Sequence, residues 1–551
     1  MKKIFIALLL IIIAVGSGIF YLFHGRGSAE TSTKYKEFSF IFEDKDIDKK
    51  DFAKIDGQYY LSFDFIKENL DENVSYDANE KTVIFTNDKG TKRIVLGEDE
   101  ATLNGQKIGL RDPIIEKDGK ILIPSEIFIY DYPVNFRFIE EKNLLLLDFS
   151  NVNYAKGYST GDGLNMREDD SINSPKVTIL KDKEEVYVYG EKGDFYRVRQ
   201  VDGYAGYIKK DKLDVEYPIE LKTSNNINKK EAVKPLNLTW DYTYGTQSQE
   251  SINAITKIDG INVNSPTWFS IQDKDLNIID RGKIEYVDKY KAQGIEVWGC
   301  FDNSFNGELT EYALQTSSRR EILIKRILEL TKKYNLSGIN IDFEHLNTET
   351  RDNLTQFVKE LSAVAKLDNI KISIDVTPQI SRDVTKEKYD RKNLAKFCDY
   401  VILMAYDQHW ASSKTAGSVA EYSWVEGNLN SVLRDVPADK LVLGVPLYSR
   451  LWTEENGSVK SNSLSMGQVN ATLSARGITP KWDDKIKQDY AQYQDGSKTY
   501  KIWIEDSRSI EWKTSLVNKY NLAGVASWRK GFESNEIWKT IENVISHINT
   551  K

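Results

Sequence analysis

Apolar strand-like runs alternate with helix-like segments from residue 236 to near the end of the chain. Eight such runs occur, and a repeated strand–helix alternation predicts a parallel (β/α)8 barrel. The runs are Leu236–Tyr242, Gly260–Ile271, Gly294–Phe301, Gly338–Glu344, Ile370–Thr377, Tyr400–Tyr406, Leu441–Leu447 and Gly524–Trp528. The gap between the last two, roughly 450–505, is too long for one helix, so we expect a small inserted subdomain that walls one side of the cleft.

The run from Ser337 to Glu344 carries two chemically different faces. Because residues alternate sides of a strand, Asn340, Asp342 and Glu344 share one face, and apolar residues share the other. A strand at a solvent-exposed edge has the same pattern. In a barrel, however, the apolar face packs on helices and the polar face points into the mouth, where chemistry is expected.

Written out as S-G-I-N-I-D-F-E, this run resembles the catalytic strand of family 18 glycoside hydrolases, D-G-x-D-x-D-x-E. Asp342 and Glu344 match the last two acids of that motif. Ser337 and Asn340 depart from the first two, and an Asn at the second acidic position is similar to the subgroup that acts on bacterial cell walls.

Further segments extend the resemblance over roughly residues 236–548. Met404-Ala405-Tyr406-Asp407 resembles the M-x-Y-D at the end of the sixth strand of the family. Leu441–Tyr448 resembles its seventh strand, and Leu522–Trp528 resembles its eighth. Trp503–Ser509 also resembles the cell-wall subgroup.

The resemblance implies substrate-assisted hydrolysis, in which the 2-acetamido oxygen of the sugar attacks the anomeric carbon. It implies three catalytic residues. Glu344 would act as the general acid and later as the base for water, Asp342 would bind the acetamido N–H, and Tyr406 would donate its hydroxyl to the acetamido oxygen. Asp342 lies on the same face as Glu344, and its like charge is expected to raise the pKa of Glu344.

Four further residues are expected to bind substrate or support the site. Asn340 can hydrogen-bond Asp342 without adding a third charge, and Met404 belongs to the M-x-Y-D segment. Asp407 is expected to support the substrate or Tyr406. The resemblance implies that Trp528 stacks beneath the sugar ring.

Two smaller modules are expected before the barrel. Residues 35–150 contain an internal repeat, in which Asp56-Gly57 and Asp118-Gly119 are hairpin turn signals. This repeat resembles the α+β module named from the N-terminal domain of copper amine oxidases, but none of its residues looks like a copper ligand. We interpret it as a stalk or a wall-contact module.

Residues 152–216 resemble a bacterial SH3-like domain, a small β-barrel. The resemblance rests on Gly163–Arg167, Phe195–Val198 and Asp202–Ile208. Such domains often contact cell-wall peptides; the alternative is a plain spacer. The polar segment 217–235 is interpreted as a linker.

The N-terminus carries Lys2-Lys3 and then an apolar run from Ile4 to Phe23. A run of this length favours an uncleaved signal anchor over residues 1–23, with a cleaved signal peptide as the alternative. The expected location is therefore the cell membrane, in a single pass with the catalytic domain outside; secretion into the cell wall is the alternative.

Charge and composition exclude some partners. The net charge of −8, without a block of Lys or Arg, argues against nucleic acid, whose phosphates need clustered cations. The four His make no ligand spacing, and we expect no metal and no cofactor. Cys300 and Cys398 fall in or beside barrel strands, which favours free buried thiols over a disulfide.

Two classes of function follow from the sequence. The first is an enzyme that cleaves β-1,4 bonds beside N-acetylated hexosamines, with peptidoglycan as the expected polysaccharide substrate and chitin as the alternative. The second is a saccharide-binding protein without catalysis. Glu344 discriminates between the classes, because a binding protein has no need of the acid.

Overall fold

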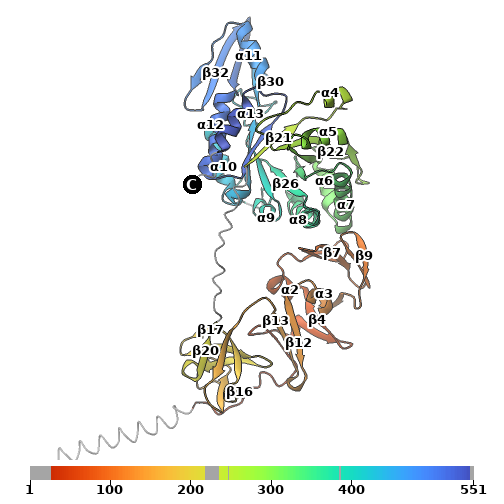
Figure 1. Ribbon diagram of the computed structural model, residues 1–551, viewed down its shortest axis with the longest axis vertical. Coiled ribbons are helices and arrows are strands. Elements are labelled where there is room, and N and C mark those ends of the chain that lie inside the picture. The colour runs from red at the N-terminus through yellow and green to blue at the C-terminus, as the bar shows by residue number, and fades with distance from the viewer. Residues whose placement is uncertain (1–26, 218–234, 246, 382, 384–385, 547–551) are drawn as a thin grey trace, which may run out of the picture. The chain divides into compact units, whose positions relative to one another are not determined.

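The computed structural model describes residues 27–217, 235–245, 247–381, 383 and 386–546 (Figure 1). These residues form two compact units. The first contains residues 27–74, 96–99 and 110–217, and the second contains residues 75–95, 100–109 and the described residues from 235 onward. The expected signal anchor, residues 1–23, and nearly all of the expected linker lie outside the described residues.

The second unit is built around a closed parallel barrel. Its strands are β21 (Leu236–Asp241), β22 (Val263–Ile271), β24 (Glu296–Asp302), β25 (Gly338–Asp342), β26 (Lys371–Val376), β27 (Tyr400–Met404), β28 (Leu441–Pro446) and β34 (Gly524–Trp528). Strand β21 pairs in parallel with both β34 and β22, which closes the ring. All eight strands expected from the sequence are present, and the (β/α)8 prediction is confirmed.

Helices cover the outside of the barrel (Figure 1). They are α4 (Gln249–Asn253), α5 (Ile284–Lys291), α6 (Gly307–Leu314), α7 (Ser317–Lys333), α8 (Arg351–Leu367), α9 (Arg391–Phe397), α10 (Tyr422–Val432), α12 (Ser507–Tyr520) and α13 (Ile537–Ile545). A short strand, β23 (Ile278–Asp280), pairs antiparallel with β22. The apolar face of β25 packs as expected: Phe343, just beyond the strand, stacks on Phe357 of α8 at a ring distance of 6.0 Å. Burying an aromatic side chain of this size stabilises the fold by roughly 2–3 kcal/mol.

The expected insertion is present between β28 and α12. It contains β29 (Tyr448–Glu455), β30 (Ser458–Ser465), α11 (Met466–Ala475), β31 (Lys481–Asp483), β32 (Gln488–Asp495) and β33 (Lys498–Ile504), in the sheet order β30-β29-β33-β32-β31. Glu505 fastens it to the barrel, because its buried carboxylate pairs with Lys513 of α12 at 2.8 Å. The backbone N–H of Glu505 donates to Ser449 Oγ at 2.8 Å.

A separate five-stranded sheet also belongs to the second unit, although it lies early in the chain. Its strands are β5 (Ser75–Asp77), β6 (Thr82–Asn87), β7 (Gly90–Val95), β8 (Glu100–Leu103) and β9 (Gln106–Gly109). The sheet packs on α7 and α8 of the barrel, so the expected module 35–150 is divided between the two units. The sequence repeat gave no sign of this division.

Acidic side chains of this sheet complete the N-terminus of α7. The first backbone N–H groups of a helix have no partner within the helix, and the side chain of Thr316 at the N-cap accepts none of them. Asp77 accepts the N–H of Ser317, and Glu80 accepts that of Ser318 at 2.8 Å. Negative charge at this end also interacts favourably with the helix dipole. Removing the sheet would therefore leave these N–H groups unpaired.

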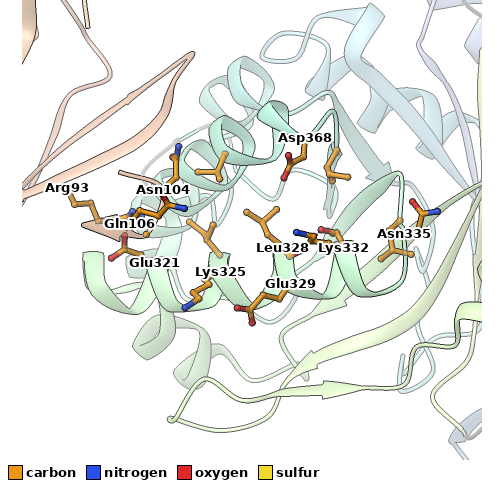
Figure 2. Close-up of a pocket in the computed structure, with 16 residues that line it drawn as sticks. Arg93, Asn104, Gln106, Glu321, Lys325, Leu328, Glu329, Lys332, Asn335 and Asp368 are labelled. Atoms are coloured by element: carbon orange, nitrogen blue, oxygen red, sulfur yellow. Dashed lines mark hydrogen bonds and ion pairs between the residues drawn. The ribbon is translucent and has the colours of Figure 1, made fainter. Parts of the chain in front are cut away.

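The sheet covers only the first turns of α7. Figure 2 shows Arg93, Asn104 and Gln106 of the sheet facing the turns of α7 that carry Glu321 and Lys325. The later turns line a groove of about 580 Å³ with an apolar floor and a charged rim. The floor includes Ile324, Leu328, Leu336, Val364 and Ile370.

The first unit contains the rest of the repeat module. One sheet has the order β10-β11-β4-β3 and another has the order β12-β13-β1-β2. The bounds are β1 (Ser39–Phe42), β2 (Lys45–Asp46), β3 (Phe52–Ile55), β4 (Gln58–Ser62), β10 (Ile115–Lys117), β11 (Lys120–Pro124), β12 (Val134–Ile139) and β13 (Leu144–Phe149), with helices α2 (Phe63–Asn69) and α3 (Ser125–Ile129). The repeat is visible here, because β4 followed by α2 matches β11 followed by α3, and Leu61 pairs with Ile123 across the two copies.

The SH3-like fold follows in the same unit as a seven-stranded sheet. Its strands are β14 (Ala155–Ser159), β15 (Leu164–Arg167), β16 (Lys176–Leu180), β17 (Glu185–Lys192), β18 (Phe195–Gln200), β19 (Ala205–Lys209) and β20 (Leu213–Glu216). Buried Arg199 of β18 pairs with Asp148 of β13 at 2.6 Å, which joins this domain to the module.

Two further observations bear on the sequence expectations. Within the described residues, no helix is long and apolar enough to cross a membrane. Cys300 and Cys398 are both buried and free, as the sequence favoured.

Candidate active site

A pocket of about 610 Å³ opens at the carboxyl ends of the barrel strands. This is the end of a (β/α)8 barrel at which active sites are found. Its lining residues are Trp240, Tyr242, Tyr244, Phe305, Asp342, Glu344, His345, Asp375, Met404, Tyr406, Asp407 and Trp528. Six of the seven residues singled out in the sequence line it; Asn340 does not.

The expected catalytic pair lies at the end of β25, where regular pairing stops. Asp342 is the last residue of the strand, so Glu344 lies beyond it and the expected strand up to Glu344 is two residues too long. The alternation nevertheless continues, because Phe343 is fully buried while Asp342 and Glu344 both face the pocket. Met404, Tyr406 and the residue after it, Asp407, approach from the end of β27.

Asn340 lies buried beneath the pocket. Its amide donates to Asp375 Oδ1 at 2.8 Å and to Ser373 Oγ at 3.0 Å, and its oxygen accepts from Trp240 Nε1 at 2.8 Å. The expected bond to Asp342 is therefore wrong. Asn340 lies opposite Ser373 of the neighbouring strand β26. Its amide therefore bonds across to side chains of β26 and not to Asp342 on its own strand.

Asp375 is a site residue that the sequence reasoning missed. The alternation of Ser373 and Asp375 with apolar residues in β26 was the available signal. Asp342 Oδ1 and Asp375 Oδ2 are both buried, and neither has a hydrogen-bond partner among the described residues. Burial, together with the charge of Glu344, raises the pKa of both carboxyls well above the usual range.

The pKa of Glu344 is raised to about 7. Burial is the largest cause, followed by the charges of Asp407 and Asp302. Burial and the repulsion between the like charges of Asp342 and Glu344 raise the pKa of Asp342. That Asp342 in turn raises the pKa of Glu344 stays a prediction. A carboxyl with this pKa is half protonated near neutral pH, which suits a general acid.

Asp407 is held in place by the first strand of the insertion. Its backbone is left-handed, with φ of +57°, and its carboxylate accepts from Tyr448 at 2.6 Å and from Arg450 at 2.9 Å. Both partners belong to β29 and neither was anticipated. The insertion thus supports this side of the pocket.

Aromatic rings form the other walls. Trp528 meets Trp240 edge-on at a ring distance of 6.0 Å and Tyr242 at 6.5 Å. Among the other tryptophans of the barrel, Trp268 and Trp298 are buried in the core, whereas Trp410 is exposed. Flat rings beside carboxyls suit a sugar, which presents apolar faces and polar edges.

Asp302 lies at the end of β24, beside the catalytic pair. Its carboxylate accepts from Tyr244 at 2.8 Å, from Ser270 at 2.9 Å and from the backbone N–H of Ser304 at 2.7 Å. Three donors thus satisfy this buried side chain. Within the described residues, no cluster of His, Cys, Asp and Glu could hold a metal ion.

Comparison with known sequences identifies the kind of site. The sequence model of glycosyl hydrolases family 18 matches residues 302–532, which include the ends of β24, β25, β27 and β34 that form the pocket. The barrel belongs to glycosyl hydrolases family 18. The copper amine oxidase N-terminal domain matches residues 42–145, and the bacterial SH3 domain matches residues 162–214. The chain therefore carries a family 18 glycosyl hydrolase domain, preceded by two smaller domains.

Similar proteins come from bacteria and animals. The chain is 26% identical over 321 residues to the uncharacterized glycosylase YvbX of Bacillus subtilis (strain 168), covering 56% of this chain and 91% of that protein. It is 25% identical over 243 residues to the cortical fragment-lytic enzyme of Bacillus subtilis (strain 168), covering 43% of this chain but only 56% of that enzyme.

Solved structures share the fold. The spore cortex-lytic enzyme SleL of Bacillus megaterium QM B1551 is 21% identical, with a TM-score of 0.51, and the match covers 56% of this chain and 73% of that one. The C-terminal domain of a putative chitinase from Desulfitobacterium hafniense DCB-2 is 23% identical, with a TM-score of 0.51. The match covers 57% of this chain and 99% of that one. At these identities the likeness concerns the fold alone.

Proposed function

We propose that this family 18 barrel hydrolyses β-1,4 bonds at N-acetylhexosamines of peptidoglycan, with retention of configuration and with the substrate's own acetamido group as nucleophile. The observation that carries the proposal is Glu344, a pocket-lining carboxyl whose pKa of about 7 keeps a proton available near neutral pH. Ordinary retaining enzymes use a second carboxylate as nucleophile, and family 18 is an exception.

In the proposed reaction, Glu344 protonates the oxygen of the leaving sugar while the acetamido oxygen attacks the anomeric carbon. Asp342, whose Oδ1 has no partner among the described residues, accepts the acetamido N–H. Tyr406 donates its hydroxyl to the acetamido oxygen, and Trp528 stacks beneath the ring. Glu344, now ionised, then removes a proton from the water that opens the cyclic intermediate.

Two observations favour peptidoglycan as the polysaccharide: the domain that precedes the barrel and the names of similar proteins. A bacterial SH3 domain precedes it, and we propose that this domain contacts the cell wall. The names of two similar proteins, a cortical fragment-lytic enzyme and a spore cortex-lytic enzyme, indicate that those proteins act on spore cortex. This supports a related substrate for this chain. This substrate lies outside the cytoplasm, and we propose that Ile4–Phe23 holds the chain at the membrane with the barrel outside.

Chitin is the second candidate substrate. A probable chitinase 10 of Drosophila melanogaster is 28% identical over 280 residues, although the match covers only 12% of that protein. Chitin and peptidoglycan share the N-acetyl group on which the proposed mechanism depends, so the chemistry of the pocket is compatible with both.

The test is digestion by the full chain of purified sacculi and, separately, of chitin oligosaccharides. Mass spectrometry of the products identifies the new reducing end, and proton NMR of the first anomer formed reports retention or inversion. The proposal expects N-acetylhexosamine reducing ends from sacculi, with retention. Cleavage of chitin alone would make chitin the substrate, and inversion would contradict substrate assistance.

A further inference from the structure

The backbone of Glu344 lies beyond the last residues of β25 that pair with the neighbouring barrel strands. Strand β25 pairs with β24 up to Asp342, which lies opposite Asp302, and with β26 up to Ile341. The backbone N–H and C=O groups of the next residues therefore have no strand partner. Buried backbone groups of this kind need other partners to avoid a cost of roughly 1–3 kcal/mol each.

The side chain of Asn303 supplies those partners. Its Oδ1 accepts from the backbone N–H of Glu344 at 3.1 Å, and its Nδ2 donates to the backbone C=O of the same residue at 2.7 Å. A carboxamide has the same donor and acceptor as a peptide group, so Asn303 continues the β24–β25 pairing by one further step.

Asn303 is itself fixed in place. It is 1% exposed, and its Nδ2 also donates to Thr310 Oγ1 of α6 at 2.8 Å. The hydroxyl of Thr310 in turn donates to the backbone C=O of Asn306 at 2.7 Å. On the other side of the acid, Tyr389 donates to the backbone C=O of Phe343 at 2.7 Å. The backbone that carries the acid is thus held on both sides by buried side chains.

We propose that Asn303 is a positioning residue for Glu344, one that fixes the backbone of the acid so that its carboxyl points at the glycosidic oxygen. This inference rests on the proposed role of Glu344. Asn303 is buried and does not line the pocket, so we place it behind the acid and not in contact with the substrate. Its effect should therefore appear in turnover and not in substrate affinity, since a misplacement of about 1 Å can cost about 10²-fold in rate.

The first variant is Asn303→Ala in the full chain, assayed on sacculi. We expect kcat to fall by about 10–100-fold while KM changes by less than about 2-fold. The matched control is Asn518→Ala in α12: the amide of Asn518 also donates to a backbone carbonyl, that of Val544 of α13 at 2.6 Å, and does not contact Glu344 or the groups that hold Asn303. The control should lower the melting temperature, as the loss of a buried hydrogen bond does, and leave kcat unchanged.

The second variant, Asn303→Asp, separates positioning from stability by its pH dependence. The introduced carboxyl can donate to the Glu344 carbonyl only while protonated, so the ratio of variant to wild-type kcat should be highest at acidic pH and fall as pH rises. The titratable groups that face Glu344 are present in both proteins: Cys300 and Asp302 from β24, Asp342 from β25, Asp375 from β26, Tyr389, and Tyr406 and Asp407 after β27. Dividing the kcat of the variant by that of the wild type at each pH cancels whatever these groups contribute equally to both proteins.

The two proposals fail in different ways. If the wild-type chain cleaves no glycan, the proposed function fails. If the wild type is active and the folded Asn303→Ala protein retains its kcat, or if the Asn303→Asp ratio does not change with pH, the positioning role is overturned.

Discussion

Arg93 of β7 and Glu360 of α8 lie 267 residues apart in the chain and form a buried ion pair. Glu360 has no exposed surface and also pairs with Arg320 of α7 at 3.0 Å. One carboxylate thus joins the five-stranded sheet to two barrel helices. The sheet is consequently a structural part of the catalytic unit.

Arg93→Ala should destabilise the second unit by about 3 kcal/mol, because it removes one partner of a buried charge. Chemical unfolding of the full chain measures this. Lys107→Ala is the matched control on the same sheet: its pair with Glu100 is exposed and screened by solvent, so its loss should leave the free energy of unfolding almost unchanged. Equal losses in the free energy of unfolding would show that the buried ion pair stabilises the unit no more than the exposed one.

A chain of residues 217–551, which lacks the sheet, should unfold at a lower temperature than the full chain. It leaves Glu360 and the N-terminus of α7 without their partners from the sheet. Its activity should fall on soluble oligosaccharides as well as on sacculi. An unchanged melting temperature, with activity lost on sacculi alone, would mean that the N-terminal part serves targeting and not the stability of the barrel.

Asp407→Asn should shift the basic limb of the kcat/KM profile to lower pH. Glu344 acts in its protonated form, and the charge of Asp407 is, after burial, the next cause of its raised pKa. Removing that charge lowers the pKa, so the proton is lost earlier as pH rises. Asparagine tolerates the left-handed backbone at this position. A profile identical to that of exposed Asp352→Asn would contradict this coupling.

The stability of the unit should fall as pH rises from about 4 through 7. Burial raises the folded-state pKa values of Glu344, Asp342 and Asp375, so these groups bind more protons when folded than when unfolded. Their favourable contribution is complete below the unfolded pKa and is lost as pH passes the folded value. Glu344→Gln should therefore raise the melting temperature above pH 7, and an unchanged or lower melting temperature there would contradict the burial of a charged acid.

Much of the fold and part of the site were predictable from sequence. The eight strands follow from apolar runs, and alternation places Asp342 and Glu344 on one face. The partners of Asn340 and the role of Asn303 were not predictable, because they depend on the register between neighbouring strands. Arg93 and Glu360 were missed for a related reason, since no local pattern links residues so far apart.

The central claim is that Glu344 is the acid of a family 18 active site, and Glu344→Gln tests it most directly. The substitution preserves shape but cannot transfer a proton, and general acid catalysis contributes about 10²–10⁴-fold. The measurement is the rate of release of reducing ends from sacculi by the full chain, with unfolding followed in parallel. The account predicts a loss of at least about 10²-fold in a protein that remains folded. A folded variant with near wild-type turnover would contradict it.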